Sequence, residues 1–194
     1  MIDARTAWLG LLLAAVPAPS PGAPAAGAPA ETRFVGPAKC RNCHFPEHRS
    51  WSAGRMAKAF ELLKPGERAE AKRKAGLDPA KDYTADPACL PCHTTGYGRP
   101  GGFVDFAGTP EMAGAGCEAC HGAGSEYLKA GRMTLSSRDY RRSDLVAAGL
   151  LLQSAANCQT LCHNETSPTH KPFDYAAGIA SEVHARTPLK FKHD

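Results

Sequence analysis

Apolar side chains recur at helical spacing in only a few short stretches of this chain. The clearest stretch runs from residue 49 to residue 63, and it predicts a helix that stops before Pro65 and Gly66. Its apolar positions are Trp51, Met56, Phe60 and Leu63. A methionine on such a face usually packs against other apolar groups, so this pattern alone places Met56 in the core.

Three more helices are predicted. Residues 67–74 carry the mixed charges of a solvated helix face. Residues 143–153 begin with Ser143 and Asp144, which are favoured at helix starts. A short helix is expected from residue 173 or 174 to about residue 184.

Irregular chain separates these segments. Residues 96–116 are rich in glycine and predict a loop, with a short extended piece at residues 103–105. Residues 167–172 are expected to be extended because of their prolines. No segment alternates polar and apolar positions for long enough to propose a sheet. The expected fold class is mainly α with extensive irregular loops.

The apolar run at the N-terminus differs from the rest. It extends from Ala7 to Val16, is too short to span a bilayer, and precedes the small-x-small sequence Ala28-Pro29-Ala30. We expect residues 1–30 to be a signal peptide, and residues 31–194 to form one domain that is exported to the bacterial periplasm. The alternative is a membrane anchor followed by a Pro/Ala linker.

Composition limits what can fill the interior. The 194 residues include 8 cysteines, 16 prolines and 19 glycines, and only 7% are aromatic. So few large apolar side chains build only a small core. Something other than side chains must therefore occupy much of the interior.

All eight cysteines fall into four pairs, and a histidine directly follows the second cysteine of each pair. The four motifs are Cys40-Arg41-Asn42-Cys43-His44, Cys89-Leu90-Pro91-Cys92-His93, Cys117-Glu118-Ala119-Cys120-His121 and Cys158-Gln159-Thr160-Leu161-Cys162-His163. Two thiols a short turn apart can add to the two vinyl groups of one haem, and the histidine can bind its iron as the proximal ligand. The motifs predict four haems c, packed together as the core of a small multihaem cytochrome c fold.

The fourth motif has three residues between its cysteines, and the extra residue can loop out while both sulfurs reach the ring. Two other interpretations compete for all four motifs. Four-cysteine zinc sites and a disulfide framework both use paired cysteines. Neither gives a reason for a histidine after every pair.

Each low-spin haem also needs an axial ligand on its other side. The histidines outside the motifs are the candidates His48, His170, His184 and His193, and Met56, Met112 and Met133 add thioether sulfurs. His48 lies one turn after His44, on the proximal side of that motif's own haem. It can therefore serve only a neighbouring haem or lie at the surface.

The net charge of +4 does not indicate a nucleic-acid partner. Each haem brings two ionised propionates, and a ferric iron in its dianionic ring contributes about one positive charge. Four oxidised haems thus bring the protein to about zero net charge, and no nucleic-acid motif is present.

These residues resemble the tetrahaem cytochrome c-554 family of bacterial nitrogen and respiratory metabolism. The matching segments are Val35-Gly36, Cys40 to His44 with Trp51, Cys92 to Tyr97 and Gly116 to Ser125. They lie within about residues 34 to 127, and the haem count extends the resemblance to the end of the chain.

The chain departs from the family at two positions. The family's first motif usually ends Ser-x-His, with the histidine as a distal ligand, whereas this chain has Gly54-Arg55-Met56. The third usually continues Gly-Ser-x-His, whereas this chain has Tyr127. If Met56 takes the ligand role, one haem becomes His/Met and higher in potential. Tyr127 is expected to be a packed side chain or a hydrogen-bond donor rather than a tyrosinate ligand.

Three functions follow as hypotheses. The first is an electron carrier that accepts electrons from one redox protein and passes them to another, where either partner can be membrane-bound. The second is a redox enzyme acting on a small nitrogen oxide, hydroxylamine or peroxide at a five-coordinate haem, with Tyr127 or a nearby Lys or His as proton donor. The third is self-assembly into a haem filament or complex, in which His193 ligates a haem of the next subunit.

Overall fold

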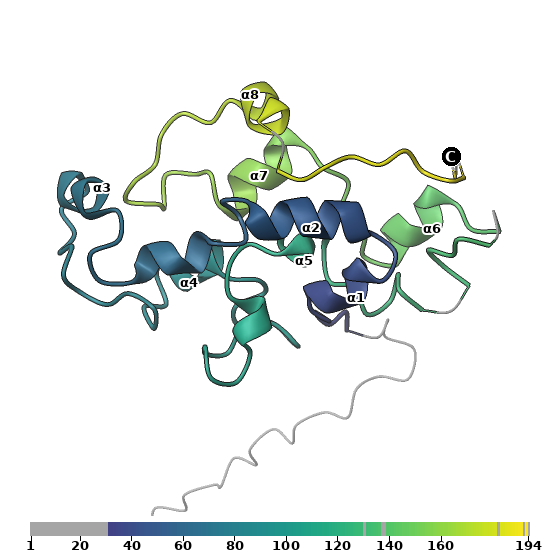
Figure 1. The fold of residues 1–194 in the computed structure, drawn as a ribbon, viewed down its shortest axis with the longest axis horizontal. Helices are drawn as coiled ribbons and strands as arrows, with labels where there is room; N and C mark the ends of the chain where they lie inside the picture. The colour runs from purple at the N-terminus through teal and green to yellow at the C-terminus, as the bar shows by residue number, and fades with distance from the viewer. Residues whose placement is uncertain (1–30, 130, 137–138, 182, 192, 194) are drawn as a thin grey trace, which may run out of the picture. The chain divides into compact units, whose positions relative to one another are not determined.

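The computed structural model describes residues 31–129, 131–136, 139–181, 183–191 and 193 (Figure 1). The expected signal peptide, residues 1–30, lies outside the described residues. Within the described part the chain forms only helices and loops, and its one β-type pairing is an isolated bridge between Thr94 and Ala113. The expectation of a mainly α fold with extensive loops is confirmed.

All of the helices are short. In chain order they are α1 (Pro37–Arg41), α2 (Phe45–Ala53), the 3-10 helix η1 (Ala59–Leu63), α3 (Ala69–Lys74), α4 (Leu90–His93), the 3-10 helix η2 (Pro110–Met112), α5 (Cys117–His121), α6 (Arg142–Ala147), α7 (Ala155–Leu161) and α8 (Tyr175–Ala180). Pro37, Pro46 and Pro91 occupy the first or second position of α1, α2 and α4, where the missing proline N–H is not needed. Helices of this length are not stable by themselves, so tertiary packing must hold them.

Where the sequence predicts longer helices, the structure interrupts them. The segment from residue 49 to residue 63 is divided because Gly54 is extended and caps α2, so Met56 lies in a turn and not on the face of Trp51. The helix predicted at 143–153 ends at Ala147, close to Gly149 at φ +100°. The helix predicted to reach about residue 184 ends at Ala180. The charged helix predicted at 67–74 forms as α3, and residues 96–116 form a loop that contains η2.

Two small clusters make up the protein's own core. The larger one combines buried residues from the segment between residues 34 and 123, namely Phe34, Phe60, Leu63, Tyr83, Leu90, Phe103, Met112 and Ala123. The smaller one consists of Tyr127, Leu145 and Ala148. Met112 is thus a packed side chain of the larger cluster. Side chains alone give this domain little interior, as its composition predicts.

A network of backbone and side-chain hydrogen bonds joins α2 and the turn after it to the loop before α5. The indole N–H of Trp51 donates to the carbonyl of Ala115 at 2.9 Å, and the N–H of Ala115 donates to the carbonyl of Met56 at 2.9 Å. The N–H of Gly114 donates to the carbonyl of His93 at 3.0 Å. The fully buried Thr95 accepts from Gly116 and donates to Gly114. Three of the four motifs are connected through this loop.

Gly114 makes the approach of this loop to α2 possible. Its φ is +89°, and a Cβ added there lies 2.2 Å from the carbonyl oxygen of Ala57. We expect Gly114→Ala to lower the free energy of unfolding by about 3 kcal/mol or more, from left-handed strain and overpacking together. Gly76→Ala is the matched control, because Gly76 has a φ of +73° but no atom near its added Cβ. Guanidinium unfolding followed by circular dichroism measures both, and equal midpoints for the two variants contradict the prediction.

No helix in the part of the chain that the structure describes is long and apolar enough to cross a membrane.

Candidate haem sites

The first motif is a single turn that leads from α1 into α2. The N–H groups of Cys43 and His44 donate to the carbonyl of Cys40 at 3.2 and 2.9 Å. His44 then serves as the N-cap residue of α2, so its side chain leaves the backbone at the junction of two helices. This turn holds the two cysteines and the histidine close together in the chain, as attachment of one haem requires.

The fourth motif accommodates its additional residue in a wider turn. The N–H of His163 donates to the carbonyl of Cys158 at 2.9 Å, although His163 lies five positions after this cysteine instead of four. The same bond at the same length closes the first motif between His44 and Cys40. The extra residue is therefore absorbed within the turn, and His163 keeps the backbone hydrogen bond to the first cysteine that His44 has.

The histidine of the second motif, His93, has a defined tautomer. Nδ1 of His93 lies 2.6 Å from the carbonyl oxygen of Ala59, which can only accept. Nδ1 therefore carries the proton, and Nε2 is left as the electron-pair donor that an iron needs. The carbonyl belongs to the first residue of η1, so the segment after α2 orients the ligand of the second motif.

Thiol contacts give the order of the motifs in space. The thiols of Cys40 and Cys117 share a hydrogen bond, which raises the pKa of Cys40 and lowers the pKa of Cys117. Burial raises the pKa of Cys120, and the nearby thiol of Cys158 raises it further. The first motif is thus next to the third, and the third is next to the fourth.

The second motif adjoins the fourth. A hydrogen bond from the Cys162 thiol lowers the pKa of Cys92 to about 7, and the Cys92 thiol also lies 3.9 Å from the carbonyl oxygen of Leu161. The spatial order of the motifs is therefore first, third, fourth, second, which differs from their order in the sequence. All four belong to one continuous series of neighbours.

His184 faces His121, the histidine of the third motif. The ring centroids of His121 and His184 are 6.3 Å apart. Two imidazoles bound to opposite sides of one metal have nearly this separation. Each metal–nitrogen bond is about 2.0 Å long, and the distance from that nitrogen to its ring centroid adds to it on both sides. Nδ1 of His184 lies 2.6 Å from the carbonyl oxygen of Ala185, so Nε2 is its unprotonated nitrogen. Burial, followed by the charge of His184, lowers the pKa of His121, which favours the neutral imidazole that binds iron.

The other three candidate histidines lie in different surroundings. His193 is 9% exposed and is held against Tyr140. His48 is half-buried on α2 with its ring edge-on to Trp51. His170 is exposed, and its charge adds to burial in lowering the pKa of His163, whose ring stacks on Phe173 at 4.1 Å. His184 and His193 are thus the two of the four that are fixed through Nδ1.

Tyr127 is a packed side chain. It is 4% exposed, and its hydroxyl donates to the carbonyl of Gly122 at 2.9 Å. Burial raises the pKa of Tyr127 well above its usual value, and nearby Glu118 adds to this shift. The neutral phenol is therefore strongly favoured, and nothing in its surroundings favours a tyrosinate ligand or a proton donor to substrate.

Sequence analysis missed one structural residue of the site, Glu118. It lies inside the third motif and is only 3% exposed, although glutamate is seldom buried. Its carboxylate accepts from the backbone N–H groups of Val35, Gly36 and Gly124 at 2.7 to 3.0 Å. It therefore joins the segment before α1 to the loop after α5. Its position between two cysteines gave no sign of this role.

The eight cysteines, all within the described residues, have free thiols. The described residues contain no group of three or more His, Cys, Asp or Glu side chains arranged to hold a metal ion. The paired thiols, the turns that close the motifs and the available Nε2 of His93 fit haem attachment.

Comparisons with known proteins agree with this geometry. Residues 39–122, which include the first three motifs, match the family described as cytochrome c554 and c-prime. Cytochrome c-554 of Nitrosomonas europaea is 38% identical over 169 residues, which cover 84% of this chain and 72% of that protein. The solved structure of the reduced state of cytochrome c554 from Nitrosomonas europaea superposes with a TM-score of 0.60 at 33% identity, covering 85% of this chain and 86% of that one. The chain therefore belongs to the cytochrome c-554 family of electron-transfer cytochromes, and its cofactors are four haems c.

Proposed function

We propose that this protein is exported to the periplasm and carries electrons between two redox proteins of a respiratory chain. The observation that carries this proposal is the continuous series of motifs. The Cys92 thiol lies 3.9 Å from the carbonyl oxygen of Leu161 in the fourth motif, and the thiols of the first and third motifs interact. The segment just before the fourth motif binds the carbonyls of Cys120 and His121 in the third. Each haem supplies an iron that gains or loses one electron. A row of such sites lets an electron enter at one end and leave at the other.

In this proposal, one set of residues attaches the haems covalently and another set binds the haem irons. The covalent bonds to haem are assigned to Cys40, Cys43, Cys89, Cys92, Cys117, Cys120, Cys158 and Cys162. The proximal ligands are His44, His93, His121 and His163. On the distal side, the geometry supports His184 for the haem of the third motif. Met56, His48 and His170 remain candidates for distal positions.

From the spatial order of the motifs we also propose where redox partners dock. The first and second motifs are the two ends of the series, and Cys43 and His44 of the first motif are exposed. A donor and an acceptor that approach these two ends exchange electrons with the outermost haems, while the third and fourth motifs connect them. The enzyme alternative lacks a proton donor at Tyr127, which already donates to Gly122.

A mass spectrum of the natively matured protein tests the assignment. We expect a mass equal to residues 31–194 plus four haems, with one haem on each motif peptide. The double variant Cys158→Ser, Cys162→Ser is expected to lose one haem and keep three. Fewer than four haems on the wild-type protein contradict the assignment, and a mass that includes residues 1–30 contradicts the proposed export signal.

Electron carriage itself is tested by stopped-flow reduction. We expect all four haems to be reduced by a quinol-linked complex or an exported dehydrogenase and reoxidised by an acceptor cytochrome. Reduction by small chemical reductants alone, with every physiological donor inactive, contradicts the carrier role.

A further inference from the structure

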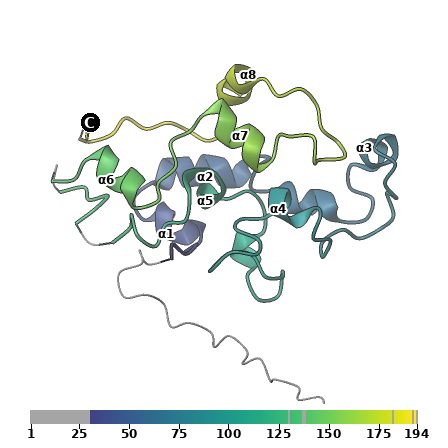
Figure 2. The same cartoon turned by 180° about the vertical axis from the view of Figure 1, so that it is seen from behind.

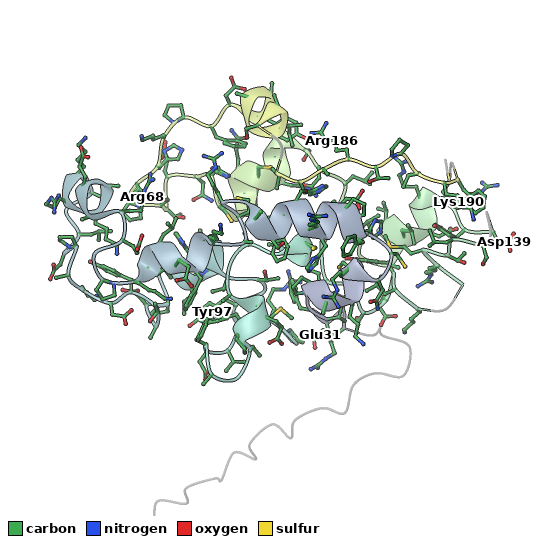
Figure 3. All side chains as sticks on the ribbon, viewed as in Figure 1. Glu31, Arg68, Tyr97, Asp139, Arg186 and Lys190 are labelled. Atoms are coloured by element: carbon green, nitrogen blue, oxygen red, sulfur yellow. The ribbon has the colours of Figure 1, made fainter. Side chains whose placement is uncertain are left out.

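The C-terminal segment runs back along α2 toward the first motif. The N–H of Ala185 donates to the hydroxyl of Ser50 at 2.5 Å, and the N–H of Thr187 donates to the carboxylate of Glu47 at 3.0 Å. The chain therefore passes from the end of α2 toward its start, where His44 is the N-cap residue. Figures 1 and 2 both show this segment beside α2 and ending near α6, and Figure 3 labels Arg186 and Lys190 along it.

Several contacts hold the end of this segment in place. The ammonium group of Lys190 donates to the carbonyl of Leu135 at 2.9 Å. The carbonyl of His193 accepts from the N–H of Arg142 at 2.6 Å. The ring of His193 stacks on Tyr140, with centroids 3.9 Å apart and planes within 13°. A histidine one residue from the C-terminus is therefore buried inside its own chain, and it does not reach outward.

The same contacts fix which nitrogen of His193 can bind a metal. Nδ1 lies 2.9 Å from the carbonyl oxygen of Tyr140, which can only accept a hydrogen bond. The proton is therefore on Nδ1, and Nε2 keeps its electron pair. His93 and His184 are held in the same way, each by a backbone carbonyl. Such a bond orients an imidazole and raises its basicity as a metal ligand.

The path of the segment places this imidazole near the first motif. Thr187 binds Glu47, which lies three positions after His44 in the first turn of α2, and the chain continues from there to His193 and Tyr140. Burial raises the pKa of Tyr140, and the charge of the Cys43 thiol adds to this shift. His193 thus lies at the end of α2 that carries Cys43 and His44. The other candidates are elsewhere: His184 faces His121, and His170 is near His163. His48 is on α2 itself, one turn beyond His44.

We infer that His193 is the second axial ligand of the haem held by Cys40, Cys43 and His44. The inference rests on the proposed attachment of a haem at the first motif. This inference explains the hydrogen bonds that hold the C-terminal segment to α2 and to Arg142, because they keep the imidazole of His193 oriented. His193 lies 149 positions after His44 in the sequence. Loss of this ligand opens one iron and leaves the other three unchanged.

Electron paramagnetic resonance of the full, oxidised holoprotein tests this inference. We expect His193→Ala to convert one low-spin ferric haem in four to a high-spin or water-ligated form. Added imidazole is expected to restore the low-spin signal, because it replaces the missing side chain. His193→Met is expected to keep the haem low-spin while raising its potential, which a merely structural role for His193 does not produce.

Two controls separate ligation from loss of structure. Lys190→Ala removes a contact of the same segment but no ligand, and we expect its spectrum to match that of the wild-type protein. In a variant that lacks the first haem, Cys40→Ser with Cys43→Ser, adding His193→Ala is expected to change nothing further. A change in one of the three remaining haems overturns the assignment to the first motif.

The outcomes also separate this inference from the proposed function. A His193→Ala protein that carries four haems by mass and retains every low-spin signal overturns the inference and leaves haem attachment intact. A wild-type protein whose Cys40 to His44 peptide carries no haem overturns the attachment on which the inference depends.

Discussion

Replacing Glu118 by alanine is expected to lower the free energy of unfolding by at least about 3 kcal/mol, because three backbone N–H groups lose their acceptor. These donors belong to Val35, Gly36 and Gly124, and the bond to Gly36 is fully buried. A buried donor without a partner costs about 1–3 kcal/mol.

The effect is measured by guanidinium unfolding of the holoprotein, with the haem content of each variant confirmed by mass. Glu70→Ala is the matched control, because Glu70 forms an exposed ion pair with Lys74 and such pairs contribute about 0–1 kcal/mol. Glu118→Gln keeps one acceptor oxygen and is expected to fall between the two. A Glu118→Ala protein with the midpoint of the wild-type protein rules out the proposed role.

Met56→His is expected to lower the potential of one haem by on the order of 0.1 V, within the range of ~0.8 V that axial ligands span. A thioether sulfur is a soft, neutral ligand that favours ferrous iron more than imidazole does. Met56 is half-buried in the turn after Gly54, where its carbonyl binds Ala115. Because Met56 lies in this turn, its side chain is not on the apolar helix face that the sequence pattern predicts.

A redox titration with optical detection measures this shift, and Met56→Leu completes the test. Leucine keeps the size of the side chain but cannot bind iron, so one haem is expected to become high-spin. Met112→Leu is the control, because Met112 is buried in the core cluster and its replacement leaves every potential unchanged. Four unchanged potentials in Met56→His refute the ligand assignment.

The sequence by itself determined the haem chemistry. A thiol pair and the following histidine act within one turn of chain, so the requirement is local and its residues are adjacent in the sequence. The wider fourth motif shows how local it is, since one carbonyl bond to His163 absorbs the additional residue. Composition likewise predicted that side chains would provide only a small core.

Only the tertiary structure decided which residues meet. Two helices are shorter than the apolar pattern predicts: α2 ends at an extended Gly54, and α6 ends before Gly149, whose φ of +100° favours glycine. The motifs follow one another in space in the order first, third, fourth and second. This order depends on how the loops pack, and no periodic pattern in the sequence indicates it. The pairing of His121 with His184 and the path of the tail to Tyr140 join residues far apart in sequence. Their contacts depend on long-range hydrogen bonds, and no local pattern encodes such bonds.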